Sequence, residues 1–122
     1  MEKTFRQGLW ELRGPAARIE AASAVAGDSA WYAGHFPDNP ILPGIAILAL
    51  VKEAIVTAEL REGRQVVITG VGRVRFRLPV RPGDRMCFLI TREERGDGWA
   101  YHFAVNLSGE AACTGIFTAR PE

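Results

Sequence analysis

The sequence of 122 residues is poor in cysteine, with only Cys87 and Cys113. Two cysteines exclude a disulfide-dense scaffold, and no cluster of cysteine and histidine has the spacing of a zinc site. Gly70-Val71-Gly72 is followed by a strand pattern rather than a helix, so a phosphate-binding loop is not indicated either. We therefore expect no metal and no cofactor. Unpaired thiols in a domain of this size indicate a reducing compartment, which predicts a cytoplasmic protein.

Long hydrophobic runs and an excess of one charge are missing as well. The longest apolar run, Gly44 to Val51, is too short to cross a bilayer. The first ten residues are polar and charged and lack the apolar stretch of a signal peptide. The net charge is only +1, whereas a general nucleic-acid binder has a strong basic excess. Neither a membrane span nor a nucleic-acid partner is expected.

The remaining composition is that of a globular domain. Hydrophobic residues make up 48% and charged residues 24% of the chain, which excludes disorder and fibrous repeats. The length predicts a single domain over residues 1–122 that can bury a core. The near-neutral total conceals a basic segment, because Arg61 to Arg95 contains 9 basic and 4 acidic residues.

The sequence pattern predicts one helix among strands. Three prolines at positions 37, 40 and 43 make residues 34–44 a stiff, non-helical loop. Good helix formers then run from Gly44 to about Arg61, with Gly63 as the expected stop. The first two turns are apolar on every side, which predicts a buried helix, and polar residues from Lys52 onward predict that its C-terminal end reaches solvent.

Strand patterns occupy most of the rest of the chain. They cover residues 16–25, 65–69, 73–78, 86–92, 99–107 and 111–119. An alternation of period two places Tyr101, Phe103 and Val105 on one face, and Gly96-Asp97-Gly98 predicts a hairpin. One helix with five or six antiparallel strands makes an α+β domain, in which a single sheet wraps around the helix.

His35 lies in the proline-rich loop directly before the helix. The stiff loop would hold the imidazole in place, and the helix N-terminus at Gly44 offers free N–H groups and the positive end of the helix dipole. These are the components for proton abstraction next to a carbonyl group. His35 would be the base, and the Gly44 N–H would stabilise the developing negative oxygen. The alternative for a single histidine is a structural hydrogen bond.

Residues 35–45 read His-Phe-Pro-Asp-Asn-Pro-Ile-Leu-Pro-Gly-Ile and closely resemble the His-Phe-Pro-Gly-x-Pro-x-x-Pro-Gly-Val signature of the 3-hydroxyacyl-acyl carrier protein dehydratases of the FabZ/FabA type. Residues 70–84 resemble the segment of that family that ends in Arg-Pro-Val-x-Pro-Gly-Asp, and the likeness extends over residues 31–120. The resemblance implies a hot-dog fold and an obligate dimer with acyl tunnels at its interface. It implies a lyase that removes water from a 3-hydroxyacyl thioester in fatty-acid or related lipid or polyketide-type biosynthesis. It also implies that the substrate contacts Phe36, Pro43, Ile45 and Ala49.

One position departs from this family. The family has Glu or Asp fourteen residues after the histidine, often supplied by the partner chain, but this chain has Ala49, whose methyl group cannot donate a proton. Glu53 lies one turn further along the same stripe, about 6 Å along the axis. We expect Glu53 to act as a displaced acid, directly or through water. The alternative is a solvated or salt-bridged Glu53.

Ala49 leaves two other functions open. The chain would be a non-catalytic acyl-binding paralogue or one subunit of a heterodimer with a Glu-bearing partner, or it would be an acyl thioesterase. The predicted assembly is otherwise a homodimer or a higher oligomer.

The arginines at positions 73, 75, 77 and 81 have two interpretations. They form either a solvated sheet face or a docking patch for an acidic partner, for which the resemblance supplies an acyl carrier protein. Coenzyme A is the alternative carrier of the thioester. His102 points away from the aromatic face of its strand and is expected to be structural or solvated, and both cysteines are expected to be small hydrophobic residues.

Overall fold

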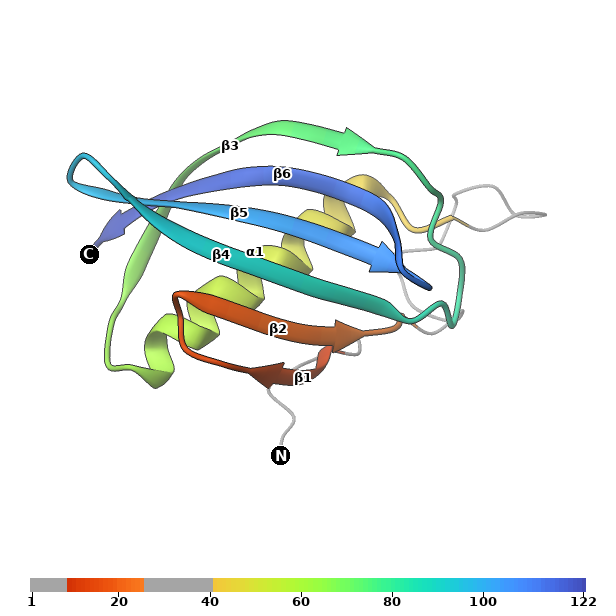
Figure 1. Cartoon of the computed structure of the whole chain (residues 1–122), viewed down its shortest axis with the longest axis horizontal. Helices are drawn as coiled ribbons and strands as arrows, with labels where there is room; N and C mark the ends of the chain where they lie inside the picture. Colours follow the sequence, from red (N-terminus) through yellow and green to blue (C-terminus); the bar gives the residue numbers. More distant parts are fainter. Residues whose placement is uncertain (1–8, 26–40) are drawn as a thin grey trace.

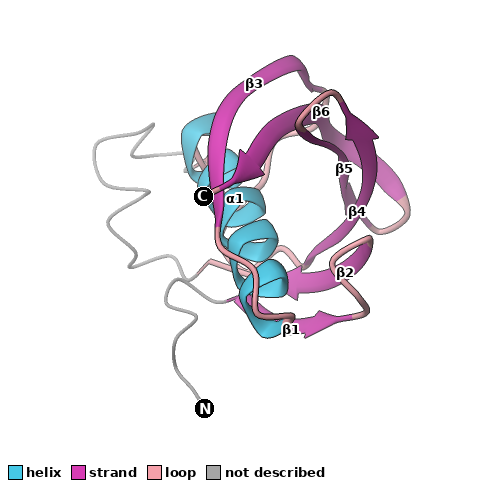
Figure 2. Cartoon of the chain, turned by 90° about the vertical axis from the view of Figure 1, so that its left-hand side faces the viewer, coloured by secondary structure: helices cyan, strands magenta, loops and turns pink. Residues whose placement is uncertain are grey.

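Figure 1 shows a computed structural model of the chain, which describes residues 9–25 and 41–122. Its elements are β1 (Leu9–Arg13), β2 (Arg18–Ser23), α1 (Gly44–Arg61), β3 (Val66–Phe76), β4 (Met86–Arg95), β5 (Gly98–Leu107) and β6 (Glu110–Pro121). The strands form one sheet in the order β1-β2-β4-β5-β6-β3, and every neighbouring pair is antiparallel. The sheet curves around one side of α1 (Figure 2). The predicted α+β class, with one sheet wrapped around one helix, is confirmed.

The helix has the predicted bounds. It begins after Pro43, whose extended backbone (φ −61°, ψ 147°) precedes the first turn, and Ala46 N–H donates to the Pro43 carbonyl at 2.9 Å. It ends at Arg61, and Gly63 follows with φ +78°, a conformation that glycine adopts without strain. Within the described residues, no helix is long and apolar enough to cross a membrane.

The hydrophobic core lies between α1 and the concave face of the sheet. The helix contributes small and branched side chains such as Ala46, Leu50 and Ile55, all buried. The sheet contributes the predicted inward face of β5, where Tyr101, Phe103 and Val105 are buried. Each fully buried aliphatic or aromatic side chain stabilises the fold by about 1.5–3 kcal/mol. Packing against the sheet, rather than helix propensity, therefore holds α1 in place.

The helix is not buried on every side, so the prediction of complete burial was wrong. Ile45 is 69% exposed, and Ala49, Lys52 and Leu60 are exposed too. These four exposed residues, which we call the open stripe, recur at spacings of four, three and eight and therefore share one face of the helix. The curved sheet leaves one side of α1 uncovered (Figure 2). The C-terminal end of α1 reaches solvent at Lys52, Leu60 and Arg61, as predicted, but Glu59 near this end is fully buried.

The strands differ from the predicted ones in two ways. The segments at 65–69 and 73–78 form a single strand, β3, with register shifts against β6 at Ile68/Gly70 and Gly72/Arg75 and a positive φ of 54° at Arg73. Strand β1 was not predicted. Phe76, the last residue of β3, is 53% exposed.

The predicted hairpin between β4 and β5 is confirmed, with Gly96 at φ +60° in its two-residue turn. Ser108 and Gly109, at φ +50° and +85°, make the tight turn between β5 and β6. Positive φ at both central residues is typical of a type I′ turn, whose twist matches that of the flanking strands.

Candidate active site

The N-terminus of α1 is a site where a negative charge would be stabilised. The cap residue, Pro43, makes no side-chain hydrogen bond to the first turn, and this turn contains no acidic residue. The backbone N–H groups and the positive end of the helix dipole are therefore not neutralised by a side chain of the helix itself. Such a helix end suits an oxyanion that develops during a reaction.

Phe76 packs directly against this helix end. Its ring lies over Gly44, the first residue of α1, and a methyl group built on Gly44 would be 2.8 Å from Cε1 of the ring and closer still to Cζ. Leu42 N–H donates to the Val80 carbonyl at 2.7 Å, which ties the chain entering the helix to the segment after β3. Glycine at position 44 thus allows an exposed aromatic ring to lie on the backbone of the helix start.

Gly44→Ala is expected to impair both stability and any activity at this site. The added methyl group must displace the Phe76 ring, and overpacking of this kind costs about 1–3 kcal/mol. We expect a lower melting temperature in a thermal denaturation scan, and we expect Phe76→Ala in the same chain to restore most of it. A Gly44→Ala variant as stable as the wild type would contradict the close packing of Gly44 and Phe76.

The predicted catalytic and substrate residues are only partly within the described chain. Pro43, Gly44 and Ile45 lie together at the helix start, and Ala49 lies on the open stripe. Glu53 is half-buried and follows Gly44 by nine residues, about 13 Å along the helix. His35 and Phe36 lie outside the described residues, so their approach to Gly44 stays a prediction.

The four predicted docking arginines are all exposed. Arg73 and Arg75 belong to β3, and Arg77 and Arg81 follow it. Strand β3 ends at the end of the molecule where α1 begins (Figure 1). Arg73, Arg75 and Arg77 have no ion pair with the described residues. A positive surface therefore lies next to the helix N-terminus.

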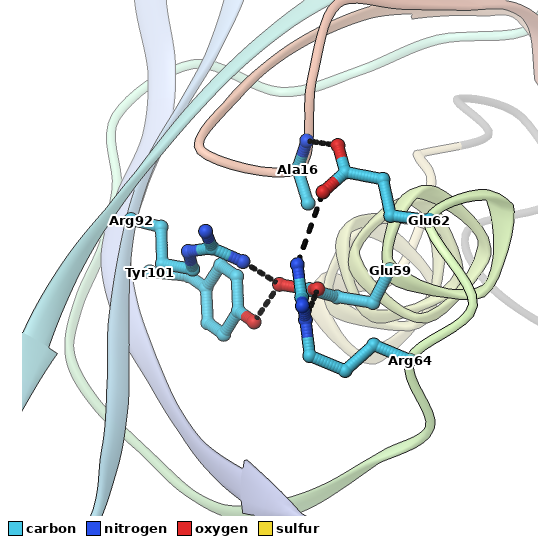
Figure 3. Close-up of polar contacts among 6 residues, drawn as sticks. All are labelled: Ala16, Glu59, Glu62, Arg64, Arg92 and Tyr101. Atoms are coloured by element: carbon cyan, nitrogen blue, oxygen red, sulfur yellow. Dashed lines mark hydrogen bonds and ion pairs between the residues drawn. The ribbon is translucent and has the colours of Figure 1, made fainter.

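Sequence reasoning missed a buried polar cluster at the opposite end of α1 (Figure 3). The Glu59 carboxylate accepts hydrogen bonds from Arg92 of β4 at 2.5 Å, Tyr101 of β5 at 2.5 Å and Arg64 at 2.8 Å. The guanidinium groups of Arg64 and Arg92 lie 5.7 Å and 5.2 Å from the centroid of the Trp99 ring, within the range of cation–π contacts. The cluster joins the helix to two strands of the sheet.

A second carboxylate, Glu62, extends this connection to the first two strands. It accepts the Ala16 N–H at 2.6 Å and an Arg64 hydrogen bond at 3.0 Å (Figure 3). Arg61 donates to the Leu12 carbonyl at 2.8 Å. Hydrogen bonds therefore join the C-terminal end of α1 to β4 and β5 and also to the chain of β1 and the turn that precedes β2.

The buried carboxylate of this cluster is hydrogen-bonded to two guanidinium groups and a hydroxyl, and these contacts determine its pKa. Burial alone would raise the pKa of Glu59, but hydrogen bonds from Tyr101, Arg64 and Arg92 outweigh burial and hold this pKa below its ordinary value. Burial and the bond to Glu59 raise the pKa of Tyr101. Glu59 follows Gly44 by fifteen residues, about 22 Å along the helix. It is therefore a structural carboxylate and not an acid for the Gly44 site.

The spacing of residues along the sequence could have predicted that Glu59 and Arg92 face the core. Glu59 follows Ile55 by four and Val51 by eight positions, which places it on the buried face of α1. Arg92 likewise follows Phe88 and Ile90 at a spacing of two on the inward face of β4. A charged residue at such a position needs a buried partner.

The described part of the chain contains one histidine and both cysteines. His102, expected to be structural or solvated, contacts Glu93 on the outer face of the sheet, and both side chains are about half exposed. Cys113 is buried, as suits a small hydrophobic residue, and burial raises its pKa to about 11, whereas Cys87 is exposed. In residues 9–25 and 41–122, no group of three or more His, Cys, Asp or Glu side chains is placed to hold a metal ion.

Comparison with known proteins gives the family. The sequence profile of the ApeI-like family, described as ApeI dehydratase, matches residues 12–116. The chain belongs to the ApeI-like dehydratase family. The sequence of this ApeI-like chain is 32% identical over 116 residues to the 3-hydroxyacyl-[acyl-carrier-protein] dehydratase FabZ of Haemophilus influenzae strain PittEE, covering 89% of the chain and 72% of the relative. It is 36% identical over 103 residues to the FabZ of Latilactobacillus sakei, covering 80% and 74%.

Solved structures agree on the fold of the ApeI-like chain. The dehydratase heterocomplex ApeI:P from Xenorhabdus doucetiae has a TM-score of 0.76 at 20% identity, covering 95% of this chain and 99% of the other. A hypothetical thioesterase with coenzyme A from Streptococcus pneumoniae has a TM-score of 0.74 at 11% identity, covering 92% and 84%. The predicted resemblance to FabZ-type enzymes, the hot-dog fold and the dehydratase class of lyases are thereby confirmed.

Proposed function

We propose that this ApeI-like dehydratase removes water from a 3-hydroxyacyl thioester presented by an acyl carrier protein. The FabZ relatives are named for this reaction. The observation that carries the proposal is the start of α1, where an uncapped helix N-terminus, Gly44 and the exposed Phe76 ring meet. The proposed setting is the cytoplasm, in fatty-acid synthesis or a related lipid or polyketide-type pathway.

In the proposed mechanism, His35 takes the proton from the carbon next to the thioester carbonyl. Negative charge develops on the thioester oxygen, and the Gly44 N–H with the helix dipole stabilises it. The bond between the third carbon and its hydroxyl then breaks, and the hydroxyl leaves as water after it receives a proton from Glu53, directly or through a water molecule. Phe36, Pro43, Ile45 and Ala49 would contact the acyl chain.

A second chain would complete the site. The open stripe of α1 and the edge strand β3 leave apolar side chains uncovered, among them Ile45, Val71 and Phe76. Among the described residues, no strand pairs with the outer edge of β3, which is eleven residues long, so its backbone N–H and C=O groups are open to a further strand. These features support a dimer, either of two identical chains or with a paralogue.

The second candidate function is that of a non-catalytic subunit. Ala49 favours it, because the methyl group on the open stripe has no proton to give, and one structure of the same fold is named as a heterocomplex. In that case, a partner with an acidic residue at the corresponding position would supply the proton.

Assaying the purified chain alone distinguishes the two functions. Formation of the enoyl thioester from a 3-hydroxyacyl-carrier substrate by the wild type would support the dehydratase. Activity that appears only in Ala49→Glu would support the non-catalytic subunit and overturn the proposed activity of the single chain. Release of a free thiol, abolished in Glu53→Gln, would indicate a thioesterase instead.

Exchanging charge in the arginine patch is expected to weaken carrier binding. The double variant Arg75→Glu with Arg77→Glu would raise the KM for a carrier-linked substrate about tenfold, which corresponds to a loss of roughly 1.4 kcal/mol in binding free energy. The KM for the coenzyme A thioester would stay nearly unchanged. Steady-state kinetics with both substrates at two salt concentrations measure this effect. Arg95→Glu, an exposed arginine in the turn region at the other end of the sheet, is the matched control. Equal effects on both substrates would contradict docking.

A further inference from the structure

A bulge in β3 controls which side chains this edge strand presents to α1. Val71 pairs with Phe117 of β6, and Phe76 pairs with Cys113 of the same strand. The interval from 71 to 76 is one residue longer than the interval from 117 to 113, so β3 carries one extra residue. Without it, the alternation of side chains would place Val71 and Phe76 on opposite faces of the sheet. The extra residue therefore turns Phe76 to the inner face, where its ring meets Gly44.

The bulge is held in a strained backbone conformation. Arg73 has a φ of +54°, in the left-handed region that residues other than glycine rarely adopt. Strain of this kind is concentrated at functional sites, and bulges next to such sites re-aim a side chain. Directly after the ring, Arg77 N–H donates to the Ala112 carbonyl at 2.7 Å, which fixes the end of the strand. The side chain that this arrangement aims at the helix start is Phe76.

The ring of Phe76 lies close enough to the Gly44 N–H to contact a group bound there. A methyl group built on Gly44 would lie about 2.5 Å from the Gly44 nitrogen, across two covalent bonds. Ring atom Cε1 is 2.8 Å from that methyl carbon, so it lies within about 5.3 Å of the nitrogen. An oxygen that accepts the N–H lies about 2.9 Å from the same nitrogen. The ring is 53% exposed and is therefore open to contact with a substrate.

The thioester oxygen occupies this position in the proposed reaction. Its carbonyl carbon carries the sulfur on one side and the second carbon of the acyl chain on the other, so both lie within a few ångströms of the ring. An apolar ring favours contact with the acyl side over the polar arm that leads to the carrier. Ile45, next to Gly44 and 69% exposed, adds to the apolar surface at this point.

We propose that Phe76 is a specificity-determining residue that restricts the site to acyl thioesters without a branch at the second carbon. The inference rests on the proposed function, because it takes the oxygen bound at Gly44 to be that of a thioester. The ring fills the space beside Gly44, since even a methyl group built on this residue would collide with it. Carbon atoms that are not bonded pack about 3.5–4.0 Å apart, so a methyl branch would have to displace the ring. An unbranched chain has only a hydrogen at that point.

The kinetic test compares an unbranched 3-hydroxyacyl thioester with its 2-methyl counterpart, with each configuration at the second carbon assayed separately. We expect the wild type to prefer the unbranched substrate by about tenfold or more in kcat/KM, within the range that one methyl group gives in a shaped pocket. Phe76→Leu should reduce this preference, and Phe76→Ala should bring it within about threefold of equality. Ile116→Ala shortens a half-buried side chain on the outer face of β6 and is the matched control, which should keep the wild-type preference.

Binding of unreactive analogues tests the same inference without turnover. Saturated acyl-pantetheine amides keep the carbonyl oxygen but have no hydroxyl to lose. In isothermal titration calorimetry, we expect the wild type to bind the 2-methyl amide about tenfold more weakly than the unbranched amide, and Phe76→Ala to bind the two alike. This measurement does not involve the catalytic base. It therefore decides the role of Phe76 even if the wild type forms no enoyl product and the proposed dehydration fails.

Three results would overturn the inference. The first is a wild type that accepts branched and unbranched ligands equally. The second is a set of Phe76 variants that keep the wild-type preference. The third is an equal loss for both ligands, because the ring would then stabilise the helix start or contact the thiol arm without selecting the acyl group. Thermal denaturation and light scattering check the fold and the assembly of each variant. Phe76→Leu keeps an apolar side chain and decides the matter if Phe76→Ala alters either of them.

Discussion

Glu59→Ala is expected to lower the free energy of unfolding by about 3–5 kcal/mol, the usual cost of removing one partner from a buried ion network. The side chain is fully buried and holds Arg92, Tyr101 and Arg64 at 2.5–2.8 Å. Its removal leaves the Tyr101 hydroxyl and the partly buried Arg92 without their acceptor, and it opens a cavity under the helix end. For a chain of this size, we expect the melting temperature to fall by roughly 10–20 °C.

The pH dependence of stability provides an independent measurement. Because the pKa of Glu59 in the folded chain lies below its ordinary value of 4.5, ionised Glu59 stabilises the fold fully above pH 4.5. This contribution is lost as the pH falls through the pKa of the folded state, where the carboxylate becomes protonated. The difference in urea stability between the wild type and Glu59→Gln should therefore be largest near neutral pH and narrow in acid.

An exposed carboxylate provides the control. Glu93→Gln removes a partner of His102 and Arg95, but these groups are about half exposed, and surface ion pairs contribute little. We expect its melting temperature to stay close to that of the wild type. Equal losses in Glu59→Gln and Glu93→Gln would contradict a special role for the buried cluster.

His35→Ala is expected to lower kcat for a 3-hydroxyacyl thioester by about 10²–10⁴-fold, the usual contribution of a positioned general base. The expectation rests on the motif that contains His35 and on the helix N-terminus that follows it at Gly44. Without the imidazole, the oxyanion-stabilising N–H, the proton donor for the leaving hydroxyl and the binding of the acyl chain would remain. Steady-state formation of the enoyl product measures the loss.

The other histidine offers a matched control for this variant. His102 lies on the outer face of the sheet against Glu93, so His102→Ala should keep kcat within about twofold. A His35→Ala variant that turns over at the wild-type rate would remove His35 from the mechanism. Another residue would then have to take the proton from the substrate next to the helix N-terminus.

Local patterns predicted most of the fold. Proline at position 43 followed by good helix formers placed α1 within its observed bounds, because φ restriction and helix propensity act within a few residues. The alternation along β5 and the glycines around Asp97 located its inward face and its hairpin for the same reason. The strand bulges in β3 escaped prediction, because register is set by the neighbouring strand and not by the strand itself.

Some features of the candidate site were also predictable from the sequence, whereas others depended on the tertiary structure. The sequence by itself determined the family motif, the Gly44 helix start and the alanine at position 49, since these are matters of residue type and spacing. Only the tertiary structure decided that α1 is covered on one side, that Phe76 lies over Gly44 and that Glu59 is buried among two arginines and a tyrosine. The physical reason is that the burial and pairing of a side chain depend on which distant strands the curved sheet brings against the helix. Residues 33, 46 or 49 positions apart along the chain carry no local signal that they will meet in space.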